Sequence, residues 1–293
     1  MKRTVFRNRW LPYALVAPQV AITLVFFFWP AFDSLRLSLY RASPFGDRLI
    51  FIGLGNFERL FADPSYLKSA GTSVLFAFFV TFIGLGLALL LASLANARIR
   101  GLGLYRSLLL WPYGIAPAIA GIIWLFIFHP SYGILPYVLS FVTAYQFNWF
   151  LEGWVAMTLI IVAAIWKQFG YNLAFYLAGL QAIEASVLEA ASVDGAGPIR
   201  RFFAITFPLL SPVTFFLFTL NMTFAFFDTF GLIHSVTQGG PGDATSILVY
   251  RAWKDGFHGL QLGLSAAQSV VLMAVVIMLT AFQFRYAEKK VTY

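Results

Sequence analysis

Few residues in this 293-residue chain are of types that carry chemistry, and they are not grouped as an enzyme needs them. There are no cysteines, so neither a disulfide nor a thiolate metal site can form. The three histidines, His129, His234 and His258, lie far apart, with few acidic residues near them. No G-x-S-x-G, H-E-x-x-H or G-x-x-x-x-G-K-[ST] motif occurs. The sequence therefore predicts no hydrolytic or metal site and no P-loop for ATP.

Polar residues within apolar stretches are the first candidates for function. Lys167 has no charged neighbour for at least a dozen positions on either side. A lysine at bilayer depth costs about 2.5–3.5 kcal/mol, so its side chain should face the protein interior or water. Gln168 and Asn172 are four apart and share one helix face. We expect these three residues to line a path for an anion such as a phosphate ester. Alternatively, Lys167 reaches the inner membrane surface or bonds to a backbone carbonyl.

Two further polar residues lie in the fifth predicted span, Asn221 near mid-depth and Asp228 close to the outer end. Asn221 is expected to line the same path. Asp228 falls roughly 30 Å along a helix from Pro208, near its outer end, so direct pairing with Lys167 is not expected. Because a carboxylate repels an anion, we assign Asp228 a gating or structural role.

The elements that position these residues are long uncharged runs. Apolar residues make up 60% of the chain and charged residues 11%, against roughly a quarter charged in soluble domains. Each run exceeds the roughly 20 residues that cross a ~30 Å hydrocarbon core. The first should be a retained span, because no small-x-small cleavage site precedes Asp33. Basic residues flank the runs rather than forming a patch, so the net charge of +8 does not indicate nucleic-acid binding. The runs are 11–32, 69–97, 202–227 and 256–284.

The sequence predicts an all-α membrane protein of six transmembrane helices in a single domain, residues 1–293. Segment 134–151 is apolar enough for a short seventh span, but the positive-inside rule favours six, with both termini cytoplasmic and 134–151 external or interfacial. The predicted spans are 11–32, 70–96, 107–128, 154–180, 209–231 and 263–284. The charged residues placed on the cytoplasmic side are Lys2, Arg3, Arg7, Arg9, Arg98, Arg100, Arg106, Arg200, Arg201, Arg285, Lys289 and Lys290, with Glu184, Glu189, Asp194 and Glu288.

One polar, glycine-containing segment, EAASVDGAGPIRRFFAITFP, separates the fourth and fifth predicted spans at 189–208. Apolar residues at helical spacing lead into it, Gly195 and Gly197 end that helix, and Pro198 suits the first turn of another. The second helix is expected to end before Pro208. The segment is then either an amphipathic hairpin on lipid headgroups or a knob that a cytoplasmic partner grips.

The spacing of this segment resembles the EAA loop of ABC importer permeases: Glu189-Ala190-Ala191, three residues, Gly195, nine residues, then Ile205-Thr206-Phe207-Pro208. The family has leucine where this chain has Phe207. Other stretches are similar to the carbohydrate-type branch, and most closely to permeases of glycerol-3-phosphate importers. They are RNRWLPYALVAPQ, LLLWPYGIAPAIAG, AAIWKQFGYNLAFYLAGLQAI, FAFFDTF, TQGGP and SAAQSVVLM.

The resemblance implies a type I ABC importer permease fold in the bacterial inner membrane. It implies a second permease in a heterodimer, two ATPase subunits that bind ATP and Mg²⁺, and a periplasmic binding protein. The chain itself is then no enzyme and binds no cofactor. Residues 181–208 become the cytoplasmic coupling loop. The coupling residues are Glu189, Ala190, Ala191, Asp194, Gly195, Arg200 and Pro208.

The substrate that the resemblance implies is sn-glycerol-3-phosphate or a related glycerophosphodiester. A neutral sugar or oligosaccharide is an alternative. An ion-coupled secondary transporter is another, although it usually needs intramembrane carboxylates and only Asp228 qualifies. The glycine-rich stretch 237–243, TQGGPGD, predicts a tight outer turn and a contact with the binding protein.

Overall fold

The computed structural model describes residues 10–43, 48–96, 109–143, 145 and 147–287. Most of these residues are helical, as expected for apolar segments whose backbone groups must be satisfied without water. A short antiparallel hairpin pairs β1 (Tyr40–Ala42) with β2 (Leu49–Phe51). The charged residues at 2–9, 98–106 and 288–290, used above to predict orientation, lie outside the described part.

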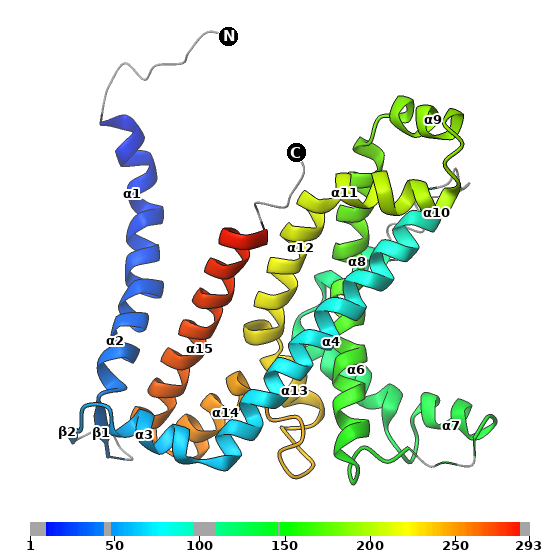
Figure 1. The fold of residues 1–293 in the computed structure, drawn as a ribbon. Coiled ribbons are helices and arrows are strands. Elements are labelled where there is room, and N and C mark those ends of the chain that lie inside the picture. Colours follow the sequence, from blue (N-terminus) through cyan, green and yellow to red (C-terminus); the bar gives the residue numbers. More distant parts are fainter. Residues whose placement is uncertain (1–9, 44–47, 97–108, 144, 146, 288–293) are drawn as a thin grey trace. The chain divides into compact units, whose positions relative to one another are not determined.

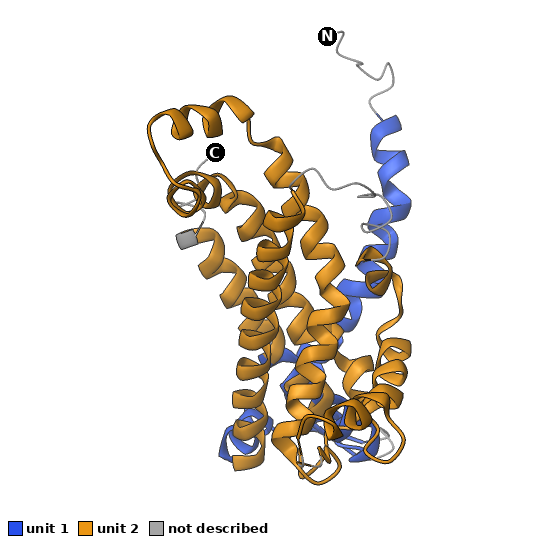
Figure 2. Cartoon of the chain, turned by 90° about the vertical axis from the view of Figure 1, so that its right-hand side faces the viewer, with its two compact units in different colours: residues 1–63, 252–271 blue, residues 64–251, 272–293 orange. Residues whose placement is uncertain are grey.

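The chain divides into two compact units, residues 1–63 with 252–271 and residues 64–251 with 272–293 (Figure 2). In the first unit, one 27-residue helical stretch runs from Leu11 to Leu37. The side-chain amide of Asn56 then donates to the carbonyl oxygens of Ser38 (2.8 Å) and Tyr40 (2.9 Å), which fixes the chain where it leaves this helix. The elements before residue 64 are α1 (Leu11–Thr23), the π-helical turn η1 (Leu24–Phe28), α2 (Trp29–Leu37), the hairpin and α3 (Gly55–Ala62).

The second unit holds most of the remaining helices, drawn in Figure 1. From residue 64 to 182 they are α4 (Pro64–Ala95), the 3-10 helix η2 (Trp111–Gly114), α6 (Pro117–Phe128), α7 (Ile134–Ser140) and α8 (Gly153–Ala182). From 185 to 236 they are α9 (Ala185–Val193), α10 (Pro198–Arg201), the π turn η3 (Phe202–Thr206), α11 (Phe207–Leu209), α12 (Ser211–Thr223), the π turn η4 (Phe224–Asp228) and α13 (Phe230–Val236). The last elements of the chain are α14 (Leu248–Trp253), η5 (Lys254–His258), α15 (Leu262–Phe282) and η6 (Gln283–Ala287).

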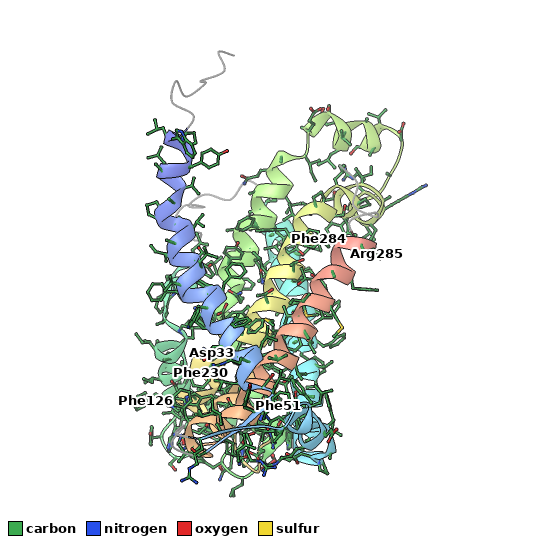
Figure 3. The ribbon with its side chains drawn as sticks, turned by 90° about the vertical axis from the view of Figure 1, so that its left-hand side faces the viewer. Asp33, Phe51, Phe126, Phe230, Phe284 and Arg285 are labelled. Carbon is green, nitrogen blue, oxygen red and sulfur yellow. The ribbon has the colours of Figure 1, made fainter. Side chains whose placement is uncertain are left out.

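Three helices of the second unit, α4, α8 and α12, share one apolar core. At Gly84, α4 packs on α8 at ordinary van der Waals range, since a Cβ there would lie 3.8 Å from the Ile165 side chain. The rings of Phe215 and Phe284 meet edge to face at 5.5 Å, which joins α12 to the end of the chain's last helical segment (Figure 3). The buried core residues are Leu85, Ala88, Ala92, Leu173, Tyr176, Leu177, Leu180, Leu210 and Leu217.

Four described helices are long and apolar enough to cross a membrane, and a bent pair makes a fifth. Four of the predicted spans correspond to these four helices, with bounds that differ by a few residues at most of the ends. They are 11–32, 70–96, 154–180 and 263–284. The bent pair, Pro198–Leu209 with Ser211–Asp228, covers most of the fifth predicted range and turns by 67°. The helices that pass are Leu11–Leu37, Pro64–Ala95, Gly153–Ala182 and Leu262–Arg285.

The third predicted span, 107–128, is not one continuous helix. Residues 107 and 108 lie outside the described part, η2 ends at Gly114, and only the 12 residues of α6 follow. The reason is local, because Pro112 and Pro117 lack a backbone N–H and Gly114 disfavours the helical conformation. At ~1.5 Å per residue, α6 alone measures about 18 Å, short of a ~30 Å core.

Segment 134–151 does not form a seventh span. Among the described residues of this segment, the helix is α7, which has seven residues, about 10 Å at the usual rise. In the second unit, α7 lies at the end where α8 begins, and α9 and α10 lie at the opposite end (Figure 1). A membrane crossed by α8 therefore separates these two regions.

Close packing of α6 on α13 makes a specific stability prediction. A Cβ on Gly121 would lie 2.8 Å from the Ser235 Cβ and 3.1 Å from the Leu232 carbonyl oxygen. We expect Gly121→Ala to lose about 1–3 kcal/mol of stability through overpacking, despite the better helix propensity of alanine. Thermal unfolding of the purified chain in detergent measures this. Gly71→Ala on α4, where a Cβ has open space, is the matched control and should unfold no earlier than wild type.

Candidate functional site

Residues 183–210, here called the elbow, form two short helical pieces joined by a sharp turn, as the sequence predicts. The first piece, α9, ends in a left-handed cap at Gly195, whose φ is +79°. The Ala196 N–H donates to the Ala191 carbonyl at 3.0 Å, and the Gly195 N–H donates to the Ser192 carbonyl at 3.1 Å. This is the Schellman pattern. No atom lies within 4 Å of a Cβ built on Gly195, so the backbone conformation alone demands glycine there.

The second piece starts at Pro198, the first residue of α10, with Gly197 extended before it. The Arg201 guanidinium donates to the Ser192 hydroxyl and thereby links α10 to α9. The sequence prediction that this piece ends before Pro208 is wrong, because the helix continues to Leu209. The preceding π turn, Phe202–Thr206, bonds five residues back, so the missing N–H and the ring of Pro208 are accommodated.

The elbow presents its motif residues to solvent. Glu189, Ala190, Asp194, Gly195 and Arg200 are exposed, whereas Ala191 is buried and Pro208 is half-buried. Two apolar side chains at the turn are also strongly exposed, Val193 at 88% and Ile199 at 76%. Side chains of this kind gain free energy when a partner covers them. The motif did not single out these two residues, although both flank its DGAGP core.

The elbow joins the membrane helices at Leu210, where the chain bends by 67°. Leu210 is fully buried. A Cβ on Gly179 of α8 would lie 2.9 Å from a Leu210 methyl and 3.0 Å from a Val213 methyl. The corner of the bend is therefore seated against α8.

The predicted path residues on α8 and α12 are all at least nine-tenths buried: Lys167, Gln168, Asn172 and Asn221. Asn172 and Asn221 exchange side-chain amide hydrogen bonds of 3.0 and 2.7 Å, which join α8 to α12. Asn221 also donates to the Leu217 carbonyl at 2.8 Å. The Lys167 ammonium donates to the carbonyl oxygens of Tyr113 (3.2 Å) and Ile115 (2.7 Å), one of the alternatives expected from the sequence. Contact of these residues with a substrate stays a prediction.

Asp228 ends the π turn η4 and is exposed. The ion pairs found in the described part of the chain do not include Asp228 with Lys167. The gating or structural role of Asp228 stays a prediction.

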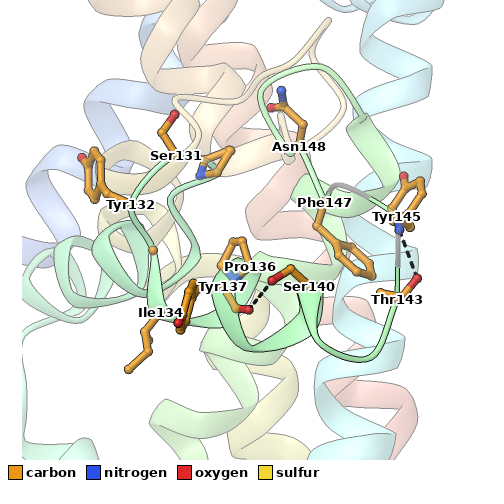
Figure 4. A pocket seen from close by; sticks show the side chains of 12 residues that line it. Ser131, Tyr132, Ile134, Pro136, Tyr137, Ser140, Thr143, Tyr145, Phe147 and Asn148 are labelled. Carbon is orange, nitrogen blue, oxygen red and sulfur yellow. Dashed lines mark hydrogen bonds between the residues drawn. The ribbon is translucent and has the colours of Figure 1, made fainter.

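Two loop regions lie at the end of the second unit opposite the elbow. Residues of segment 130–148 line a cavity of about 750 Å³, among them Tyr132, Tyr137 and Phe147 (Figure 4). Nearby, the Tyr145 hydroxyl donates to the Glu152 carboxylate, and this hydrogen bond, with burial and the negative charge, raises the pKa of Tyr145 to about 12.

The predicted tight turn at 237–243 is confirmed. Its backbone has positive φ at Gln238, Gly239 and Gly242, and the Thr237 and Thr245 hydroxyls meet at 2.7 Å across its base. A Cβ on Gly239 would clash with the Tyr250 ring at 2.7 Å. The glycines are thus explained by the turn itself, and its contact with a binding protein stays a prediction.

Residues 84–293, which include α8, the elbow and α12, match the family described as binding-protein-dependent transport system inner membrane component. The chain belongs to this family. The expected membership of the ABC importer permeases and the inner-membrane location are therefore confirmed.

Similar proteins carry the name of one transport system. The chain is 53% identical over 295 residues to the sn-glycerol-3-phosphate transport system permease protein UgpA of Rhizobium meliloti (strain 1021), covering 100% of both chains. It is 50% identical to the protein of the same name from Escherichia coli O157:H7, covering 99% of this chain and 98% of that one.

The fold of this permease is similar to solved importers. One is the crystal structure of a bacterial ABC transporter involved in the import of the acidic polysaccharide alginate, with a TM-score of 0.81 at 20% identity and 96% of each chain covered. A second, of a bacterial alginate ABC transporter in complex with alginate pentasaccharide-bound periplasmic protein, gives 0.79 at 21% identity, covering 94% of this chain and 92% of that one. At this identity the likeness establishes the fold, and the expected importer-permease architecture is confirmed at that level.

The amide pair between α8 and α12 predicts non-additive mutations. Asn172→Leu leaves the buried Asn221 amide without its partner, which should cost about 1–3 kcal/mol, and Asn221→Leu should do the same to Asn172. Replacing both removes both unsatisfied groups, so the double variant should lose less stability than the two single losses added together. Thermal unfolding in detergent measures all three. Strict additivity would show that the two amides do not support each other.

Proposed function

We propose that this chain is a permease subunit of an ATP-driven importer that moves sn-glycerol-3-phosphate, or a related glycerophosphodiester, across the inner membrane by alternating access. The observation that carries the proposal is the solvent-exposed elbow, with Glu189 and Asp194 beside the bare apolar side chains of Val193 and Ile199. The substrate is inferred from the names of the similar proteins, which refer to sn-glycerol-3-phosphate transport.

The chain works with partners in this proposal. Two ATPase subunits bind ATP and Mg²⁺, since this sequence has no P-loop, and a second permease completes a heterodimer. A periplasmic binding protein delivers the substrate, as the alginate importer in complex with its periplasmic protein suggests by analogy. The chain itself holds no cofactor and catalyses no reaction.

The orientation follows from the elbow. We place the elbow, which overlaps the coupling loop 181–208, and both termini in the cytoplasm, with six spans in a single permease domain of residues 1–293. The interrupted stretch before and through α6 counts as the third span. The placement of α7 and α9 at opposite ends of the second unit supports this arrangement (Figure 1).

The elbow acts as a rigid lever. Its two helices are held at a fixed angle by the Gly195 cap and by the bond from Arg201 to Ser192. Closure of the ATPases on ATP moves the lever as one body. The corner at Leu210, seated against Gly179, passes the motion to α8 and α12, a rigid-body switch between outward and inward states.

The substrate and the energy source are tested together. The chain is reconstituted in proteoliposomes with its second permease, ATPases and binding protein, and uptake of labelled sn-glycerol-3-phosphate is compared with uptake of a disaccharide. We expect uptake of the phosphate ester only when ATP is supplied. Disaccharide uptake alone would favour a neutral-sugar permease. Uptake that persists without ATP while an ion gradient is held would favour a secondary transporter.

Variants of the elbow test the coupling. Glu189→Ala removes the exposed carboxylate, and Gly195→Val forces a β-branched residue into the left-handed conformation, which costs about 1–3 kcal/mol. We expect each to reduce uptake at least tenfold while membrane abundance stays near that of wild type.

The matched control is Glu184→Ala, an exposed acid on the same loop that lies outside the motif. It should transport normally. If Glu189→Ala and Gly195→Val also transported normally with ATP hydrolysis still coupled, the elbow would not be the docking element.

A further inference from the structure

The interrupted third span leaves backbone oxygens open at bilayer depth. After η2 ends at Gly114, Ile115 and Ala116 are extended (ψ 135° and 141°), and α6 begins at Pro117. The Tyr113 carbonyl would normally accept from the N–H four residues on, but that residue is Pro117, which has none. The Ile115 carbonyl lies outside the ladder, whose first bond runs from Ala120 to Ala116. Two such oxygens without donors are costly away from water.

Lys167 supplies the missing donors from α8. Its ammonium lies 2.7 Å from the Ile115 oxygen and 3.2 Å from the Tyr113 oxygen, and 5.8 Å from the centroid of the Tyr113 ring. The side chain is only 6% exposed. The buried cation and the two part-buried carbonyl oxygens thus satisfy one another.

The surface of α8 around Lys167 packs closely against the interrupted part of the third span. A Cβ on Gly170 would lie 2.0 Å from the Leu109 carbonyl oxygen, so only glycine allows this approach. One helical turn after Lys167, the Tyr171 ring stacks on the Tyr113 ring with centroids 4.8 Å apart. On the other side of Lys167, the rings of Trp166 and Trp111 meet edge to face at 6.0 Å. Residues 109–115 are therefore held against α8 by packing as well as by hydrogen bonds.

We propose that Lys167 is a positioning residue for transport: it holds the break in the third span against α8, and it does not bind the substrate directly. An anion at the ammonium would have to displace two carbonyl oxygens, whose partial negative charges repel it. The polar contacts of Lys167 bind α8 to the start of α6, so the break keeps its geometry when the spans move. The test by uptake rests on the proposed function, whereas the test by hydrogen exchange does not.

Three variants test the proposal in the reconstituted importer. Lys167→Met removes the donors, Lys167→Arg keeps them, and Gly170→Ala disturbs the same contact without changing charge. Two matched controls, Lys68→Met at an exposed site and Gly86→Ala in open space, lie on α4. Uptake is measured against substrate concentration at a fixed amount of binding protein.

We expect Lys167→Met, which leaves two carbonyls unsatisfied, and Gly170→Ala, whose Cβ would clash with the Leu109 carbonyl, each to lower the maximal uptake rate about tenfold. The half-saturating substrate concentration should stay within about twofold of wild type. Lys167→Arg should recover most of the rate, and both controls should behave as wild type. A raised half-saturating concentration in Lys167→Met with an unchanged maximal rate would show a substrate ligand and overturn the proposal. Normal transport by Gly170→Ala would also overturn it.

Hydrogen exchange of the isolated chain in detergent gives a readout that needs no transport. Amides in residues 109–116 should exchange faster in Lys167→Met than in wild type, and at the wild-type rate in Lys167→Arg. Equal exchange in all three would overturn the positioning role whatever the substrate is. If Lys167→Met fails to enter the membrane, Lys167→Arg and Gly170→Ala decide by the same two measurements. Absence of glycerol-3-phosphate uptake by wild type would contradict only the proposed function.

Discussion

The structure of this permease depends on one constraint: a backbone N–H or C=O in hydrocarbon must find a partner within the protein. An unsatisfied group there costs several kcal/mol, comparable to the net stability of a whole domain. Continuous helices such as α8 meet the constraint by themselves. Where the third span breaks at Gly114, the constraint is met from outside, by the ammonium of Lys167. The same rule explains why Asn172 and Asn221, two amides at full burial, bond to each other.

The elbow lies under a different constraint, because water can satisfy its polar groups. Its two helical pieces, Ala185–Val193 and Pro198–Leu209, are too short to be stable alone in water. They are held by the glycine cap, by the bond from Arg201 to Ser192 and by the buried corner at Leu210. Rigidity built from these contacts leaves the outer face free for a partner. That combination of a stiff interior and a bare apolar tip is what a lever between two proteins needs.

Much of this could be predicted from the sequence, and the failures share a cause. The uncharged runs predicted the spans because lipid excludes charge whatever the neighbouring segments are. The spacing around Gly195 predicted the elbow because the helix cap at Gly195 is formed by residues adjacent in sequence. The break before α6 and the path of the chain through Pro208 depend on which hydrogen bonds other segments offer, and a linear pattern does not contain those. The partner of Asn172 lies 49 positions away, so its helix face was predictable and its bond was not. The exposure of Val193 emerges only once the turn is folded.

The central claim is that the elbow faces the cytoplasm and meets the ATPase there. The chain has no native cysteine, so a single introduced cysteine reports one position. Val193→Cys at the elbow, 88% exposed, and Val142→Cys after α7, 83% exposed, form a matched pair. In the assembled importer in intact cells, a membrane-impermeant maleimide should label position 142 and not position 193, and position 193 should cross-link to the ATPase subunit. Labelling of position 193 from outside would contradict the account.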